Sequence, residues 1–460
     1  MKLKGLSSWG KDFLLKKVIR NSTYLFASQA ISAILSILTA NLLGVASFGV
    51  LGVVISFISN VNRLMSFRMS EFIVRYMGAA IAKDEKQQAV AVIKVAAITE
   101  AITSLVAFAI LMLLAPWAAE KFAKDPSFAI LFRIYGLTIL GNIFTETSTG
   151  VLQVTGHFRS QAVNNLIQGV ITAGLFAMVY INQGGVREVM LVYLVGKLIL
   201  GLGPVVLAFY WLHKLWGKGW WKGTLKGVLP PRKEMARFAV STNLSGTINL
   251  VARDSEVLWV SYFFSTVEAG YFKVALAVVN LAVMPITPFI STTYPELAKS
   301  VAIGAWDRLK SLLKRVTTIS VVWTGTVIAG LLILGRQLLF SPINLFGKTI
   351  QIYQSSYLPA YTVLMVLMIG FGMANIFFWD RSLLLSFNKP GFVLRVAAIG
   401  MLLKTTLAFV LVPKFGYVME AVLLSAYFIG TVGTILVRGL KEIKYQEGIH
   451  TETLPISPGS

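Results

Sequence analysis

The chain has 460 residues, of which 56% are hydrophobic and 13% are charged. A soluble domain cannot bury so many apolar side chains, which excludes an ordinary soluble enzyme and indicates a lipid bilayer as the solvent. The formal charge of +22 does not indicate nucleic-acid binding, because most basic residues flank apolar segments. Without cysteine, and with only three scattered histidines, we expect no disulfide, metal site or cofactor.

Hydropathy predicts an all-α polytopic membrane protein with about twelve spanning helices of about 20 residues each. The first apolar run is too long for a cleaved signal peptide, so we expect it to stay as the first span. The expected spans are Val18 to Leu43, Phe48 to Ser66, Ala89 to Ala115, Phe128 to Val154, Ala162 to Ile181, Val189 to Leu212, Phe238 to Phe264, Gly270 to Tyr294, Val316 to Phe340, Tyr357 to Trp379, Phe392 to Val412 and Val418 to Leu436.

The chain therefore divides by span and by the composition of its connecting segments. Trp216, Trp220 and Trp221 alternate with lysines in the middle of the chain, which is typical of a segment that anchors at the lipid headgroups. The predicted parts are a cytoplasmic interfacial amphipathic segment (1–17), an N-lobe of six spans (18–213), a basic, Trp-rich cytoplasmic linker (214–237), a C-lobe of six spans (238–438) and a cytoplasmic tail (439–460).

Alternate loops differ in charge, and this difference predicts the orientation. Val45 to Ser47 and Ser265 to Ala269 contain no Lys or Arg, whereas four loops are basic: Arg63 to Lys86, Lys214 to Arg237, Lys299 to Arg315 and Arg381 to Arg395. This division places about thirty of the 42 Lys and Arg residues on one side. By the positive-inside rule that side is the cytoplasm, and both termini lie there. We expect a multi-pass protein of the plasma or inner membrane.

The two halves contain similar turns, which indicates a duplication. Leu43 to Gly49 and Phe264 to Gly270 both read as a short turn that ends in glycine, and Tyr180 to Gly185 resembles Leu411 to Gly416. The offsets of about 221 and 231 residues are nearly constant. Each half has an even number of spans, so we expect two parallel six-helix repeats related by a pseudo-twofold axis along the membrane normal.

At these turns the chain resembles the polysaccharide transport family of the multidrug, oligosaccharidyl-lipid and polysaccharide exporter superfamily, which includes O-antigen flippases. The resemblance covers nearly the whole chain and includes Glu71 to Arg75, Ala269 to Phe272, Tyr294 to Leu297 and Pro413 to Tyr417. It departs from the family at Val418 to Ala421, where a Gly-Ala-Ala type run is usual. The resemblance implies a prenyl-diphosphate-linked glycan as substrate, membrane lipids and possible polysaccharide-assembly proteins as partners, and no enzymatic activity.

Ionisable residues inside the spans are the candidate site, because each costs roughly 2.5 to 3.5 kcal/mol at a helix centre unless it lines a cavity or forms an ion pair. The candidate cations for the diphosphate are Arg253, Lys404, Lys197 and Lys273. For Arg253 a structural alternative stays open, because Glu256 lies three residues along the same helical face. Lys404 has no acid within one turn of its own helix.

Acidic residues and helix breakers complete the prediction. A carboxylate at depth can couple transport to H⁺ or Na⁺, although an ion pair or hydrogen bonds with neighbours would explain it equally well. The ion-coupling candidates are Glu100, Glu146, Asp254 and Glu256, and the hinge candidates are Pro285, Pro288, Pro204 and Gly370. Close packing of small residues is the alternative for the glycines.

We therefore expect a flippase that moves a lipid-linked oligosaccharide from the cytoplasmic to the outer leaflet by alternating access. Two alternatives remain. An ion-coupled multidrug antiporter of the same superfamily would favour an apolar, acid-lined pocket over deep cations. A membrane-embedded glycosyltransferase or polymerase would need a sizeable loop or an acidic pair at one face, and the sequence predicts neither.

Overall fold

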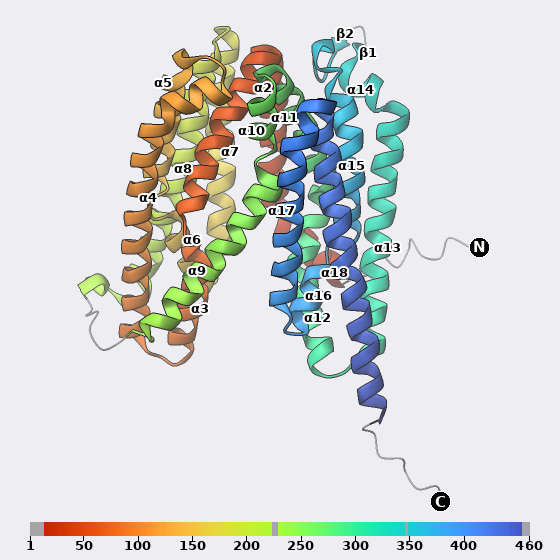
Figure 1. Cartoon of the computed structure of the whole chain (residues 1–460). Coiled ribbons are helices and arrows are strands. Elements are labelled where there is room, and N and C mark those ends of the chain that lie inside the picture. Colours follow the sequence, from red (N-terminus) through yellow and green to blue (C-terminus); the bar gives the residue numbers. More distant parts are fainter. Residues whose placement is uncertain (1–12, 223–228, 346–347, 453–460) are drawn as a thin grey trace, which may run out of the picture. The chain divides into compact units, whose positions relative to one another are not determined.

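The computed structural model describes residues 13–222, 229–345 and 348–452 (Figure 1). By internal contacts the chain forms two compact units, which we call the N-terminal unit (Tyr24–Gly270) and the C-terminal unit (Met1–Thr23 with Tyr271–Ser460). Most of the predicted interfacial segment 1–17, part of the predicted linker and the end of the predicted tail lie outside the described residues.

The helices follow the predicted spans closely. Those up to Gly270 are α2 (Phe13–Met65), α3 (Met69–Ala82), α4 (Lys86–Phe122), η1 (Pro126–Phe128), α5 (Ala129–Gly141), α6 (Thr145–Val154), α7 (Phe158–Ile181), α8 (Val186–Trp216), η2 (Trp220–Lys222), α9 (Arg232–Asn249), η3 (Leu250–Asp254) and α10 (Glu256–Phe263). The chain continues with α11 (Thr266–Val283), η4 (Met284–Ile286), α12 (Thr287–Ala302), α13 (Trp306–Gly330), η5 (Leu331–Gly335), α14 (Arg336–Phe340), η6 (Ser355–Tyr357), α15 (Ala360–Ile376), α16 (Asp380–Ser386), α17 (Pro390–Phe415) and α18 (Val418–Glu452).

The predicted all-α membrane class is confirmed for the described residues. Within this described part of the chain, ten helical stretches are long and apolar enough to cross a bilayer. The first covers two predicted spans that meet at Gly44, where the backbone leaves the helix (φ 71°, ψ 174°), and α9 to α10 corresponds to the predicted seventh span. A short antiparallel hairpin, β1 (Ile343–Leu345) with β2 (Lys348–Ile350), interrupts the helices, with Ile343 opposite Ile350.

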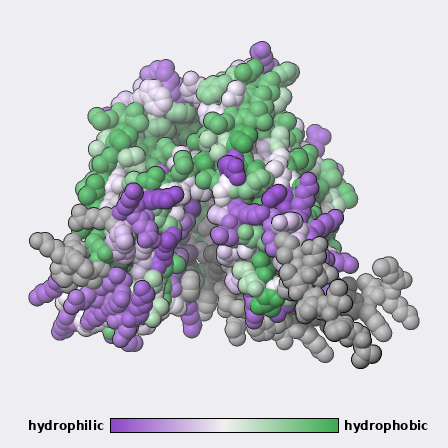
Figure 2. All heavy atoms as spheres, turned by 60° about the horizontal axis from the view of Figure 1, so that its bottom comes forward, coloured by the Kyte–Doolittle hydropathy of each residue, from purple (hydrophilic) through white to green (hydrophobic). Residues whose placement is uncertain are grey.

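Lipid contact explains the exposed surface of the helices. Large apolar side chains project from the outer helix faces, and Leu113 is 80% exposed and Ile333 76%. Figure 2 shows hydrophobic side chains along the helix flanks and hydrophilic ones gathered toward the helix ends that face the viewer. In a bilayer the flanks would face acyl chains, where apolar groups carry no cost.

The predicted basic loop from Arg63 to Lys86 is wrong in its first part. After a short break at Ser66 to Arg68 the chain continues as α3, whose buried face includes Phe72, Ile73 and Met77. At 1.5 Å per residue, α3 adds about 21 Å to the second span. Arg63 therefore lies at a break within a long span. The prediction ended that span too early because basic residues follow Arg63.

The predicted seventh span packs with the first six. Glu234 near the start of α9 pairs with Arg75 of α3 at 3.1 Å, and the Asn60 amide of α2 donates to the Ser255 hydroxyl at 2.9 Å. At the far end the Lys124 ammonium donates to the carbonyl of Tyr262 in α10. By contacts the units therefore divide at Gly270, whereas the sequence places the division in the linker before residue 238.

The two repeat-related turns contact each other inside the N-terminal unit. A Cβ added to Gly49 would lie 1.7 Å from the carbonyl oxygen of Thr266, and one added to Gly270 would lie 2.4 Å from that of Val45. Both glycines are therefore required by close backbone approach. Each contact maps onto the other by the predicted offset of about 221 residues, as a two-fold relation between the turns requires.

In the C-terminal unit α18 packs along α15 and α17. A Cβ on Gly370 of α15 would lie 2.4 Å from the Cα of Ser425 in α18, and the Ser425 hydroxyl donates to the carbonyl of Val366 at 2.7 Å. Figure 1 shows α18 extending past the neighbouring helices. The predicted tail (439–460) is helical as far as Glu452, because α18 continues to that residue.

Candidate functional site

The fourth span is broken in its middle. Helix α5 ends at Gly141, residues 142–144 form a turn, and α6 begins at Thr145. The neighbouring α8 approaches this turn closely, because a Cβ on Gly201 would lie 2.4 Å from the carbonyl oxygen of Gly141. The Thr145 hydroxyl donates to the carbonyl of Gly201 at 3.0 Å and fixes the two helices together. Non-helical backbone at this depth is tolerated where it lines a cavity or packs against protein.

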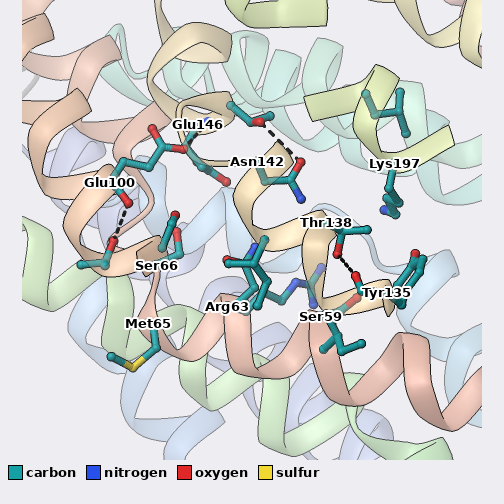
Figure 3. A pocket seen from close by; sticks show the side chains of 17 residues that line it. Ser59, Arg63, Met65, Ser66, Glu100, Tyr135, Thr138, Asn142, Glu146 and Lys197 are labelled. Carbon is teal, nitrogen blue, oxygen red and sulfur yellow. Dashed lines mark hydrogen bonds between the residues drawn. The ribbon is translucent and has the colours of Figure 1, made fainter. Parts of the chain in front are cut away.

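A cavity of about 350 Å³ lies beside this break, within the N-terminal unit (Figure 3). Polar residues from α2, α4, α5, α6 and α8 and from the breaks after α2 and α5 line most of it. They are Ser59, Asn62, Arg63, Ser66, Glu100, Thr103, Ser104, Tyr135, Thr138, Asn142, Thr145, Glu146 and Lys197. Its size is in the usual range for ligand sites, and its hydroxyl and amide groups can bind a hydroxylated solute.

Glu100 of α4 caps the start of α6. Its two carboxylate oxygens accept hydrogen bonds from the backbone N–H groups of Glu146 at 2.8 Å and Thr147 at 2.9 Å. Two predicted ion-coupling residues therefore lie together, because Glu146 itself accepts hydrogen bonds from the backbone and hydroxyl of Ser70 in α3. A carboxylate is favourable here because it satisfies two amides that have no backbone partner and meets the positive end of the helix dipole.

Two cations face the same cavity. Lys197 of α8 and Arg63 of α2 both line it, and both side chains are exposed. Figure 3 shows Lys197 on the side of the cavity nearer Tyr135 and the two glutamates on the opposite side. The charged residues of the lining are thus Arg63, Lys197, Glu100 and Glu146, which balance when all are ionised.

Asp254 connects the predicted Arg253 to this group. One carboxylate oxygen of Asp254 lies 2.7 Å from Arg63, and the other lies 3.2 Å from the Nε atom of Arg253. Arg253 thus pairs with its chain neighbour Asp254, where the π-helical turn η3 ends. Glu256 is buried at the start of α10, with 1% of its surface exposed.

The remaining predicted cations belong to the C-terminal unit. Lys404 of α17 is 3% exposed and pairs with Glu420 of α18 at 2.6 Å, so the absence of an acid on its own helix was misleading. Its partner lies in the segment where the sequence departs from the family pattern. Lys273 is half-buried in α11. The structure therefore brings together Lys197, Arg253, Glu100, Glu146 and Asp254 and leaves Lys404 and Lys273 in the other unit.

The hinge candidates lie at different kinds of position. Pro285 is within the short turn η4 that separates α11 from α12, and Pro288 is in the first turn of α12. Pro204 is buried inside the continuous helix α8. Gly370 lies where α15 touches α18, so close packing accounts for its small size.

Arg63 and Tyr135 line the cavity but were not predicted from the sequence as site residues. Arg63 was assigned to a loop because it begins a basic stretch, and only α3 shows that the span continues beyond it. Tyr135 gave no signal, since a tyrosine within an apolar span is ordinary. Its hydroxyl is buried in the cavity wall and has no hydrogen-bond partner among the residues that the structure describes.

A family model described as "polysaccharide biosynthesis protein" matches residues 14–301. The chain belongs to this family. It is a multi-pass membrane protein, and the match confirms the predicted resemblance to a polysaccharide family. Inner membrane protein YghQ of Escherichia coli K12 is 22% identical over 298 residues, which are 64% of this chain and 84% of that protein.

Three solved structures share the fold of this family member. An inward-facing multidrug resistance MATE family transporter has a TM-score of 0.72 and 14% identity, with 92% of this chain and 96% of that chain covered. The lipid II flippase MurJ in an inward closed conformation has a TM-score of 0.66 and 16% identity, over 93% and 90% of the two chains. A superfamily transporter from Pyrococcus furiosus has a TM-score of 0.64 and 13% identity, over 97% and 100%.

Proposed function

We propose that this transporter flips a prenyl-diphosphate-linked oligosaccharide from the cytoplasmic to the outer leaflet by alternating access. The observation that carries the proposal is the cavity in which Lys197 and Arg63 are exposed beside a broken helix. Cations in a polar cavity suit a diphosphate, which forms charge-assisted hydrogen bonds, and the surrounding hydroxyl groups suit a glycan. The family and the likeness to a lipid II flippase support the same substrate class.

The prenyl tail has no need of the cavity, because it can stay in the bilayer while the headgroup crosses. The loop charges support cytoplasmic termini, since the positive-inside rule places basic loops there. In this arrangement the headgroup enters from the cytoplasmic leaflet, and the helix breaks near Pro285 and Asn142 supply mobility. Other polysaccharide-assembly proteins would supply the substrate and use the product.

The test follows a fluorescent prenyl-diphosphate oligosaccharide in liposomes with an impermeant quencher. Each charge-assisted hydrogen bond is worth about 1.5–3 kcal/mol, so Lys197→Met should weaken headgroup binding by about tenfold to a hundredfold. Lys197→Arg should retain most of the exchange. Lys121→Met is the control, because Lys121 pairs with Glu120 outside the cavity.

A second candidate is export of cationic drugs, which the two carboxylates of the cavity favour. The same liposomes distinguish the candidates if a cationic dye is supplied in place of the lipid. Dye transport without lipid exchange would replace the flippase proposal by drug export. If wild-type protein accelerates neither, with or without an ion gradient, both proposals fail.

A further inference from the structure

Two backbone N–H groups at the start of α6 can bind an anion, and the protein's own Glu100 carboxylate occupies them. Helix α6 has ten residues, and its first N–H groups are satisfied in two ways. Thr145 and Ser148 donate to backbone carbonyls of the preceding turn, whereas the N–H groups of Glu146 and Thr147 donate to Glu100 alone. A helix N-terminus that points two N–H groups at one acceptor is the arrangement that binds phosphate groups in proteins.

A second feature of the same cavity indicates that a ligand is accommodated there. Tyr135 lines the cavity and is 1% exposed, and its buried hydroxyl has no hydrogen-bond partner within the described part of the chain. A buried hydroxyl without a partner costs about 1–3 kcal/mol, so a ligand that supplies a partner is favoured. Lys197 and Arg63 are also exposed to this space.

The Glu100 carboxylate resembles the ligand expected at such a site. It is an anion with two oxygens, and each oxygen accepts one helix N–H, as two oxygens of a phosphate group would. Phosphate and carboxylate cannot occupy the two N–H groups together, because both are anions that need the same donors. A carboxylate displaced by a phosphate would also lie close to the carboxylate of Glu146.

We infer that the start of α6 is the phosphate-binding end of the cavity, that Glu100 occupies it when the cavity holds no ligand, and that the diphosphate displaces Glu100, which then takes up a proton. The inference rests on the proposed function and adds to it a mechanism of coupling. Proton uptake follows from charge. A displaced, ionised Glu100 would lie beside two other negative groups, Glu146 and the bound dianion, which is unfavourable. A protonated Glu100 carries no charge and avoids this repulsion.

The other charged groups around Glu100 do not replace it in this role. Arg63 and Arg253 keep their charge at every physiological pH and share Asp254 between them. Lys197 lies across the cavity and supplies positive charge to the ligand. Glu146 is held by the backbone and hydroxyl of Ser70, so its carboxylate keeps its own partners when the ligand enters.

The experiment measures sulfate binding to the purified full-length protein by calorimetry between pH 5.5 and 8. Sulfate is a tetrahedral dianion that does not itself titrate in this range, and two buffers of different ionisation enthalpy give the protons taken up. Wild-type protein should take up about one proton per sulfate where Glu100 is ionised, with affinity rising about tenfold per unit fall in pH. Glu100→Gln should bind sulfate with no proton uptake and with little dependence on pH.

Two controls separate this role from a structural one. Glu146→Gln should keep the proton uptake, and Lys197→Met should lower the affinity without changing the number of protons. Proton uptake that persists in Glu100→Gln, or that disappears in Glu146→Gln, would overturn the inference even if lipid exchange is normal. Conversely, proton-linked sulfate binding in a protein that exchanges no lipid would support displacement of Glu100 by an anion but remove the proposed function.

Discussion

The buried ion pair between Lys404 and Glu420 offers a direct test of how charge is accommodated inside this protein. Their nitrogen and oxygen atoms lie 2.6 Å apart, with side chains 3% and 0% exposed. At an effective dielectric constant of about 20 the attraction is about 6 kcal/mol, and the desolvation of each ion costs several kcal/mol. The two terms nearly cancel, so the pair contributes little net stability while each ion depends on the other.

Lys404→Met should therefore destabilise the protein by about 3–5 kcal/mol, because it leaves the Glu420 carboxylate buried without its cation. For a unit of this size that loss lowers the melting temperature by roughly 6–20 °C. The double variant Lys404→Met with Glu420→Met should regain most of the loss, since two apolar side chains need no partner. Tryptophan fluorescence during heating of detergent-solubilised protein measures all three proteins.

Lys414→Met is the matched control, because Lys414 is exposed on the same helix α17. A wild-type melting temperature in Lys404→Met, or a double variant that melts as low as the single one, would contradict this interdependence of the two ions. The double variant also reports on function. Normal lipid exchange in it would assign Lys404 a role in structure and remove it from the candidate diphosphate ligands.

Two further predictions concern the close helix contact and the loop before α7. Gly201→Ala should destabilise the protein by about 1–3 kcal/mol in thermal unfolding, because its Cβ would meet the Gly141 carbonyl oxygen at 2.4 Å; Gly174→Ala, which meets nothing within 4 Å, should not. His157 stacks on Trp211, and burial together with the charge of Lys214 lowers its pKa below the usual value. The unfolded chain therefore binds a proton first, so stability should fall as pH drops below about 6.5, and His157→Gln should lessen that loss in melting temperatures measured from pH 5 to 8. An unchanged pH profile in His157→Gln would contradict this assignment.

Much of the architecture could be predicted from residue type alone. Apolar runs of spanning length predict the helices. Backbone N–H and C=O groups without hydrogen bonds cannot lie in hydrocarbon, and a helix satisfies these groups internally. The glycines at the repeated turns were recognisable for a similar reason: Gly49 and Gly270 lie where two backbones touch, and no side chain fits there. These features depend on local chemistry and on the solvent, which the sequence contains.

Charged residues at depth were identified as a group, but the sequence could not say which of them act together. Lys404 looked unpaired because its partner lies on the next helix, and Arg63 looked superficial because the break at Ser66 to Arg68 resembles the end of a span. Whether an ion faces a cavity or a partner depends on how helices distant in sequence pack. Only the tertiary structure decided that Glu100 reaches the N–H groups of α6 across the cavity from Lys197, since a bend within one helix is set by the contacts of its neighbours.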